Sequence, residues 1–292
     1  MTALRSFLFI PGDSAKKLAK VDDCGADAVI LDLEDAVAIA NKSVAREMVT
    51  AFLKERPRAG RTVQLWVRIN PLDTEWAVDD LAAIVAGDPD GIMQPKTNGP
   101  EDVRTLSTQL DRLEAANGLP AGDIRILPVA TETPIAPFRL GDFAQAGLTR
   151  LAGLTWGAED LSAAMGASTN LGPDGHWAFT YQLVRSLTLM AAHASGVPAF
   201  ETLYVDFRDD DGLRSSCRAA RAEGFAGRIA IHPAQVAAIN ESFSPSDDEI
   251  AFARRVIAAF EAEPAVGTVG IDGKMYDIPH LKAARRTLES AL

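Results

Sequence analysis

Short apolar segments recur along the chain and are separated by longer segments in which apolar residues follow a helical pattern. Eight apolar segments can be recognised, and they begin at Ser6, Ala28, Leu65, Gly91, Ile124, Leu151, Thr202 and Arg228. Their starts lie 22 to 51 residues apart, and nearly every interval has room for one helix and two loops. Repeated strand-helix units predict a parallel α/β sheet, and eight units are the number in a TIM (β/α)8 barrel.

Helical patterns cover residues 37–54, 138–146 and 180–194. One long connection, residues 166–175 (GASTNLGPDG), follows the sixth strand and is expected to be a mobile loop at the mouth of the barrel.

The C-terminal segment is not needed to complete a barrel. A helix is predicted over residues 247–262, followed by a break at residues 264–267, a hairpin around Asp272-Gly273 and a helix from Pro279. We therefore expect a catalytic barrel domain over residues 1–263 and a C-terminal extension over residues 264–292. By itself this pattern requires no functional role, because a helix that simply covers one end of the barrel would show the same pattern.

Composition narrows the class of protein. The chain is 47% hydrophobic and 24% charged, as in ordinary globular enzymes, and its formal charge of −11 argues against nucleic-acid or anionic-membrane surfaces. Cys24 and Cys217 are too far apart in sequence to suggest a metal cluster or a disulfide framework. The first apolar segment is too short for a signal sequence or a membrane span. These observations favour a cytoplasmic protein.

Polar residues gather where the predicted strands end. Because the carboxyl ends of barrel strands share one face, these residues are candidates for the active site. They are Glu34, Asp35, Arg68, Asn70, Lys96, Glu132, Glu159, Asp160, Asp206 and His232. Some of them could instead be ion-paired stabilisers, and the sequence leaves that open for each residue taken singly.

Glu132 and Asp160 are the best metal candidates. One or two carboxylates, with the remaining positions left to water and substrate, suit Mg²⁺, whereas the lack of a His or Cys cluster disfavours Zn²⁺. Spacing alone does not separate Asp160 from its neighbour Glu159. Arg68 would face a bound oxyanion, or it would pair with one of these acids.

The N-terminal segment carries the one local concentration of basic residues near a strand end. Its members are Arg5, Lys16, Lys17 and Lys20. They could contact phosphate groups, although a solvated helix face explains them equally simply. His176, His193 and His280 are each isolated in the sequence, which favours structural or exposed positions over catalytic ones.

Several motifs taken together resemble a known family. LFIPG, VILDLEDAV, VRIN, PK, ETP after the fifth strand, WGAEDL, IHPAQ and GKMYD occur in this order. The combination is similar to the HpcH/HpaI aldolase and citrate lyase β-subunit group, in its CitE-like and malyl-CoA lyase branch. Each motif is weak alone, but their order and spacing are specific and extend from Arg5 to the tail.

The resemblance implies a Mg²⁺-dependent TIM-barrel lyase that breaks or forms a carbon-carbon bond between an acyl-CoA and a 2-oxo acid. It implies that Glu132 and Asp160 bind Mg²⁺ and that Arg68 binds the 2-oxo acid. It also implies that Asp277 enters the active site of a neighbouring subunit in a homo-oligomer, a trimer or a multiple of it. Arg5 and Lys16 are the candidates for contacts to coenzyme A. Pro134 departs from the small residue that many relatives have after the Glu-Thr pair.

Three functions are compatible with this resemblance. The first is cleavage of a β-hydroxyacyl-CoA such as malyl-CoA or citramalyl-CoA. The second is hydrolysis at the same site, as in a malyl-CoA thioesterase. The third is a citryl-CoA lyase subunit that acts only within a multi-subunit complex.

Overall fold

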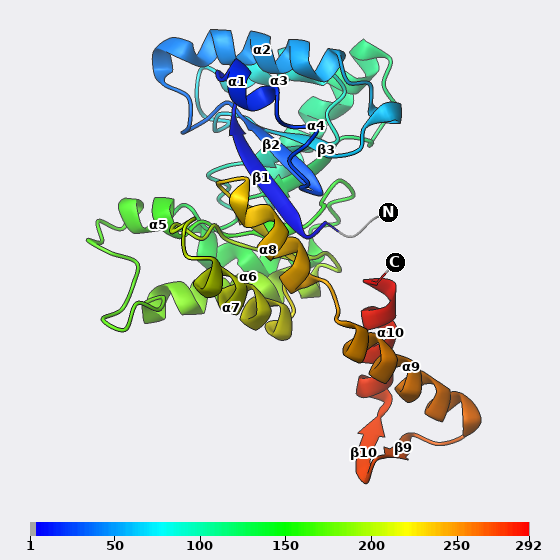
Figure 1. Ribbon diagram of the computed structural model, residues 1–292. Helices are drawn as coiled ribbons and strands as arrows, with labels where there is room; N and C mark the ends of the chain where they lie inside the picture. The colour runs from blue at the N-terminus through cyan, green and yellow to red at the C-terminus, as the bar shows by residue number, and fades with distance from the viewer. Residues whose placement is uncertain (1–3, 292) are drawn as a thin grey trace.

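The protein, described here by a computed structural model over residues 4–291, is built on a barrel of parallel strands surrounded by helices (Figure 1). Within the described residues the strands are β1 (Ser6–Pro11), β2 (Ala28–Asp32), β3 (Gln64–Arg68), β4 (Gly91–Gln94), β5 (Arg125–Pro128), β6 (Leu154–Thr155), β7 (Ala199–Glu201) and β8 (Gly227–Ala230). Their order in the sheet is β5-β4-β3-β2-β1-β8-β7-β6. Isolated parallel bridges Ile126–Leu151 and Val129–Thr155 connect the two ends of this order. The predicted TIM-type barrel is confirmed.

The helices follow the strands in alternation. They are α1 (Ala15–Leu18), α2 (Lys42–Lys54), α3 (Ala77–Val85), α4 (Pro100–Asn117), α5 (Ala158–Ala164), α6 (Phe179–Ala194), α7 (Asp210–Glu223) and α8 (Ala234–Phe243), with 3-10 helices η1 (Ile39–Asn41), η2 (Arg58–Gly60) and η3 (Ala136–Gln145). Most of the segment predicted as helical over residues 138–146 falls within η3, which ends at Gln145. It contains Pro137 and Gly141, which are poor formers of an α-helix.

The seventh strand differs from the prediction. The apolar pattern predicts it from Thr202, but β7 comprises the three residues before Thr202, all of them buried. Val205 and Phe207, which gave the run its apolar character, lie in a loop and are 60% and 41% exposed. Asp206 is therefore a loop residue and not the end of a strand. The polar residue that ends the strand is Glu201, which is 1% exposed.

The side chains of the strands alternate between two apolar layers. Phe7 points into the barrel, where its ring meets Trp66 and Phe200 edge-on with centroid distances of 5.6 and 4.8 Å. Leu8, the next residue, packs in the larger cluster that joins strands to helices. A Cβ on Gly91 would lie 2.2 Å from the Trp66 ring, so the interior layer requires glycine there.

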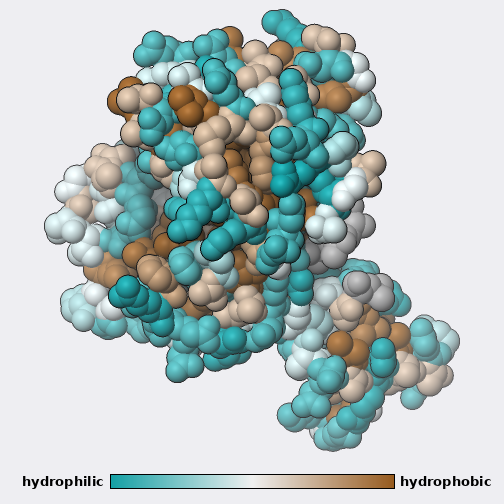
Figure 2. Space-filling view, turned by 45° about the horizontal axis from the view of Figure 1, so that its top comes forward, coloured by the Kyte–Doolittle hydropathy of each residue, from teal (hydrophilic) through white to brown (hydrophobic). Residues whose placement is uncertain are grey.

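The C-terminal extension is a separate lobe beside the barrel (Figures 1 and 2). It consists of α9 (Asp247–Ala262), β9 (Thr268–Ile271), β10 (Lys274–Asp277) and α10 (Ile278–Glu289). The predicted hairpin turn is present, with Asp272 and Gly273 at positive φ values of 52° and 76°. Apolar residues of α9, the hairpin and α10 share one cluster, so the expected domain limit at residue 263 falls inside this lobe.

None of the helices within residues 4–291 is long and apolar enough to cross a membrane.

Candidate active site

The carboxyl ends of the strands bring a group of charged side chains to one face of the barrel. Five carboxylates surround the two cationic side chains Arg68 and Lys96. They come from the end of β2 and the loop after it, from the loop after β5 and from the start of α5, and they are Asp32, Glu34, Asp35, Glu132 and Asp160. The excess of negative charge indicates a site that is suited to a cation.

Arg68, the last residue of β3, is held from three sides. Its Nε and Nη2 donate to the two oxygens of Asp32 at 2.8 and 2.6 Å, and its Nη1 lies 2.8 Å from Glu34. The ring of Phe9 lies 4.5 Å from the guanidinium carbon. Although burial alone would lower it, these carboxylates raise the pKa of Arg68 above its ordinary value. Arg68 therefore carries a fixed positive charge in a buried position.

Lys96 connects three of the acids around its ammonium group. The Nζ pairs with Glu34 and lies 3.3 Å from both Asp35 and Asp160. Its backbone has a positive φ of 49°, a conformation that non-glycine residues seldom adopt. Such strain is common where the structure needs a side chain at one place. Burial raises the pKa of Glu34, an effect that Arg68 and Lys96 oppose.

Glu132 is the buried carboxylate of the site. It is 5% exposed, and one of its oxygens accepts a hydrogen bond from the backbone N–H of Lys96 at 2.6 Å. Burial and the nearby charges of Asp160 and Glu34 raise the pKa of Glu132 to about 8. A Cβ on Gly157 would lie 2.8 Å from Glu132 Cγ and 3.1 Å from its Oε1, so glycine makes room for this side chain.

The two neighbouring acids of WGAEDL point to different partners. Asp160 lies beside Lys96, whereas Glu159 accepts a hydrogen bond from Asn170 at 2.8 Å. The contact with Asn170 ties Glu159 to the loop over residues 166–175. The structure thus separates two residues that the sequence left equivalent, and it brings Asp160 toward Glu132.

The residues of this group fit a magnesium ion. Glu132 and Asp160 offer carboxylate oxygens. Burial, together with the charges of Asp160 and Glu34, raises the pKa of Glu132, and a bound cation would stabilise its ionised form. Within residues 4–291, no three or more His, Cys, Asp or Glu side chains form a ready-made metal cluster. The protein would supply two ligands, which leaves other positions to water and substrate, as is usual for Mg²⁺.

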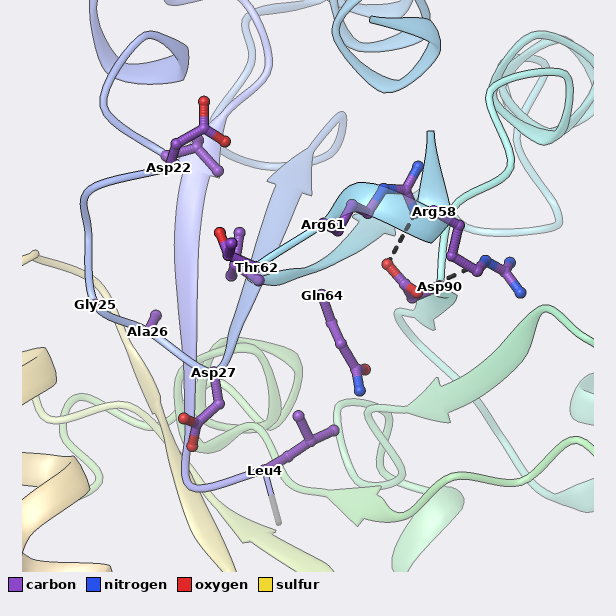
Figure 3. Close-up of a pocket in the computed structure, with 12 residues that line it drawn as sticks. Leu4, Asp22, Gly25, Ala26, Asp27, Arg58, Arg61, Thr62, Gln64 and Asp90 are labelled. Atoms are coloured by element: carbon purple, nitrogen blue, oxygen red, sulfur yellow. Dashed lines mark hydrogen bonds and ion pairs between the residues drawn. The ribbon is translucent and has the colours of Figure 1, made fainter. Parts of the chain in front are cut away.

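Arg5 lies at the opposite end of the barrel. It precedes β1, and its guanidinium donates to Asp27 at 2.8 and 2.9 Å and to Ser244 at 3.0 Å. Asp27 also lines a pocket of about 490 Å³ formed by residues just before β2, β3 and β4 (Figure 3). There Arg58 and Arg61 pair with Asp90. This pocket and Arg5 are apart from the charged group described above.

Lys16 and Lys17, in contrast, follow the carboxyl end of β1 on α1, and both are exposed. Asp277 ends β10, and its contacts lie within the extension. In Figure 1 β1 points toward α1 and away from the extension, so β10, which Asp277 ends, lies beyond the other end of its own barrel. The structure does not bring Asp277 together with Arg68, Glu132 or Asp160 of the same chain.

Two residues of the site were missed in the sequence. Asp32 lies inside the apolar segment that begins at Ala28, and an acid inside a buried run is itself a signal of a special role. Gly157 follows the apolar run that begins at Leu151 and carries no functional group. Its importance depends on the position of Glu132, which is distant in the sequence.

Comparisons with known proteins show the family of the chain. The sequence pattern of the HpcH/HpaI aldolase/citrate lyase family matches residues 5–233. The chain is 35% identical to citrate lyase subunit beta of Escherichia coli (strain K12), over 98% of this chain and 93% of the relative. It is 36% identical to a (3S)-malyl-CoA thioesterase of Cereibacter sphaeroides, over 98% of this chain and 94% of the relative.

A solved structure extends the likeness to three dimensions. Protein CitE from Mycobacterium tuberculosis, in complex with magnesium, acetoacetate and coenzyme A, is 33% identical and superimposes with a TM-score of 0.79, over 99% of this chain and 98% of the other. Together with the barrel and its charged site, these matches show that the chain belongs to the HpcH/HpaI aldolase/citrate lyase family. It is an enzyme of the lyase type that this family comprises.

Proposed function

We propose that the protein is a Mg²⁺-dependent carbon-carbon lyase. Its substrate would be a β-hydroxyacyl-CoA such as malyl-CoA or citramalyl-CoA, which it cleaves to an acyl-CoA and a 2-oxo acid, or forms from them. The observation that carries the proposal is the gathering of Glu132, Asp160 and Arg68 at one barrel face. A relative of similar fold that was solved with magnesium, acetoacetate and coenzyme A supports the substrate class.

Each residue of the site has a chemical task in this proposal. Glu132 and Asp160 hold Mg²⁺, which when bound stabilises negative charge on the oxygens of the oxo-acid half. Arg68 binds the carboxylate of the 2-oxo acid through N–H groups that Asp32 and Glu34 leave free. Phe9 covers one face of the guanidinium and limits its orientation.

Asp277 would exchange the proton of the acyl-CoA half, from the extension of a neighbouring subunit. The surface of the extension supports an oligomer, because several of its apolar side chains lie open to solvent in the single chain (Figure 2). They are Phe252, Val266, Met275 and Ile278. Contact with the barrel of another copy would bury them. We infer a homo-oligomer, a trimer or a multiple of it.

Lys16 is the residue we assign to the phosphate groups of coenzyme A. It is exposed, and it follows β1 at the same end of the barrel as Arg68. Arg5 is left out of the proposal because Asp27 and Ser244 already occupy its guanidinium at the other end. A cytoplasmic location is our expectation for an enzyme of this kind with two free cysteines.

Two alternative functions would use the same active site. The relative from Cereibacter sphaeroides is a malyl-CoA thioesterase, so water could cleave the thioester in this chain as well. The relative from Escherichia coli is a citrate lyase subunit, which favours action within a multi-subunit complex.

One experiment separates these functions. The purified protein is incubated with Mg²⁺ and malyl-, citramalyl- or citryl-CoA, and the products are identified by mass. We expect an acyl-CoA and a 2-oxo acid. Free CoA together with malate would instead indicate a thioesterase. The absence of any reaction with all three esters, with and without Mg²⁺, would contradict the lyase proposal for the isolated chain.

A further inference from the structure

Asp277 has a close partner in the same extension. Nδ1 of His280 lies 2.5 Å from Oδ1 of Asp277 and 3.2 Å from the Asp277 backbone nitrogen. The side chain of His280 is 53% exposed and that of Asp277 is 43% exposed. The contact belongs to a capping box at the start of α10, in which the Asp277 side chain also accepts a hydrogen bond from the backbone N–H of His280. The capping box therefore sets where the carboxylate of Asp277 lies.

The backbone of Asp277 is fixed on both sides. On one side β10 pairs with β9, with Asp277 opposite Thr268. On the other side α10 begins at Ile278, and Pro279 occupies its first turn. The side-chain torsions of Asp277 are therefore its main remaining freedom, and the contact with His280 restricts them.

The imidazole is itself held in place by aromatic contacts. The ring of Tyr276 meets it edge-on, with a centroid distance of 5.2 Å and an interplanar angle of 86°. Tyr276 in turn meets Phe252 of α9 at 5.5 Å and 62°. Ring contacts thus connect α9 to His280, and His280 contacts the carboxylate of Asp277. The carboxylate is therefore held in a fixed position relative to the lobe.

We propose that His280 is a positioning residue, which holds the carboxylate of Asp277 in the orientation that it needs in the neighbouring subunit's active site. The inference rests on the role of Asp277 in the proposed function. In the condensation direction a proton passes from the α-carbon of the acyl-CoA to the Asp277 carboxylate. In cleavage it returns. Misplacement of such a group by about 1 Å is enough to cost on the order of a hundredfold in rate.

Donation from His280 lowers the pKa of the Asp277 carboxyl. An aspartate is already ionised near neutral pH, so the hydrogen bond acts on the position of the carboxylate and not on its charge.

The test uses the full-length protein with Mg²⁺ and whichever CoA ester the wild type cleaves. His280→Phe keeps a ring beside Tyr276 but removes the donor, whereas His280→Asn keeps a donor near the position of Nδ1. We expect His280→Phe to lower kcat about tenfold or more with little change in KM. His280→Asn should retain most of the activity. His193→Phe, in an exposed histidine on α6, is the matched control and should leave kcat unchanged.

A double variant distinguishes positioning from damage to the lobe. If His280 acts through Asp277, Asp277→Ala combined with His280→Phe should be no slower than Asp277→Ala alone. If the wild type is active and the kcat of His280→Phe is unchanged, this inference is overturned and the lyase proposal is left intact. Additive losses in the double variant also overturn it. A wild type that cleaves no CoA ester overturns both.

Discussion

At the scale of single residues, Gly157 illustrates how an uncharged position can control a proposed metal site. Its backbone lies against Glu132, and a methyl group there would meet Cγ at 2.8 Å and Oε1 at 3.1 Å. Because Glu132 is buried, its side chain has little room to retreat. The geometry of this carboxylate therefore depends on a residue that carries no functional group.

We predict that Gly157→Ala weakens Mg²⁺ binding by about tenfold or more, a size that is typical when a group supporting a metal ligand is changed. The reason is displacement of the Glu132 carboxylate. Mg²⁺ affinity can be measured by calorimetry. Gly141→Ala is the control, because a Cβ at that position meets nothing within 4 Å. Equal affinities in the two variants would contradict the proposed role of Glu132.

Glu132 itself should make the metal-free protein less stable as the pH rises. Burial and neighbouring carboxylates raise its pKa to about 8, above the value of about 4.3 in an unfolded chain. The folded state thus holds a proton that the unfolded state has lost, and stability falls between these two pKa values as pH increases. In a chelator, Glu132→Gln should be more stable than the wild type at pH 8, by on the order of a few kcal/mol.

Urea unfolding at pH 5 and pH 8 checks this prediction. The difference between the variant and the wild type should be larger at pH 8. The same variant should bind Mg²⁺ more weakly, because it has lost a charged ligand. A difference in stability that is the same at both pH values would mean that Glu132 is ionised throughout this range.

At the scale of elements, a buried ion pair joins α4 to the segment that leads into β6. Glu114 is fully buried, and Arg150, which is 2% exposed, donates to both of its oxygens. Glu114 also accepts hydrogen bonds from the backbone N–H groups of Gly122 and Ile124. Several strand and helix ends therefore depend on one carboxylate.

We predict that Glu114→Ala destabilises the protein by about 3 kcal/mol, because it leaves a buried arginine incompletely paired. The pKa of Glu114 is lowered, opposing the effect of burial, by Arg150 and the backbone N–H groups. Its stabilisation is therefore complete above the unfolded pKa and is lost as the pH falls through the folded one. Denaturant unfolding at pH 7 measures the loss. As a control, Glu101→Ala removes an exposed partner of Arg139 and should cost less than about 1 kcal/mol.

The strands show which elements a sequence can specify. β1 and β2 are short, apolar and followed by polar residues, and they lie where the pattern predicts them. β7 was misplaced because its three residues are too few for a visible alternation, while the more apolar run after it remains in a loop. Burial is decided by neighbouring strands, and hydrophobicity alone does not report it.

At the scale of the whole molecule, topology explains why much of the site could be predicted. In a parallel barrel every strand ends on the same face, so Arg68, Glu132 and Asp160 meet although they are far apart in the sequence. Side-chain partners could not be predicted in this way. Asp32 and Glu34 surround Arg68, and Asp27 holds Arg5 at the other end, because of packing between distant segments. The roles of Glu132, Asp160 and Arg68, like those of Asp277 and Lys16, remain predictions.

The shared active site can be tested by mixing two inactive proteins. Asp277→Asn removes the proton-exchanging group, and Arg68→Ala removes the group that binds the 2-oxo acid, so each homo-oligomer should be inactive. If Asp277 acts in a neighbouring subunit, a mixed oligomer contains some sites that combine an intact barrel with an intact extension. Random assembly at equal amounts places both intact parts in about a quarter of the sites.

We therefore expect roughly a quarter of wild-type activity after the two variants are unfolded together and refolded, or co-expressed. The control is a mixture of Asp277→Asn with Glu132→Gln/Asp277→Asn, in which every extension lacks Asp277. That mixture should stay inactive. If the first mixture is also inactive while size measurements show mixed oligomers, the extension does not supply Asp277 to another subunit. The exposed apolar residues of the lobe would then require a different partner.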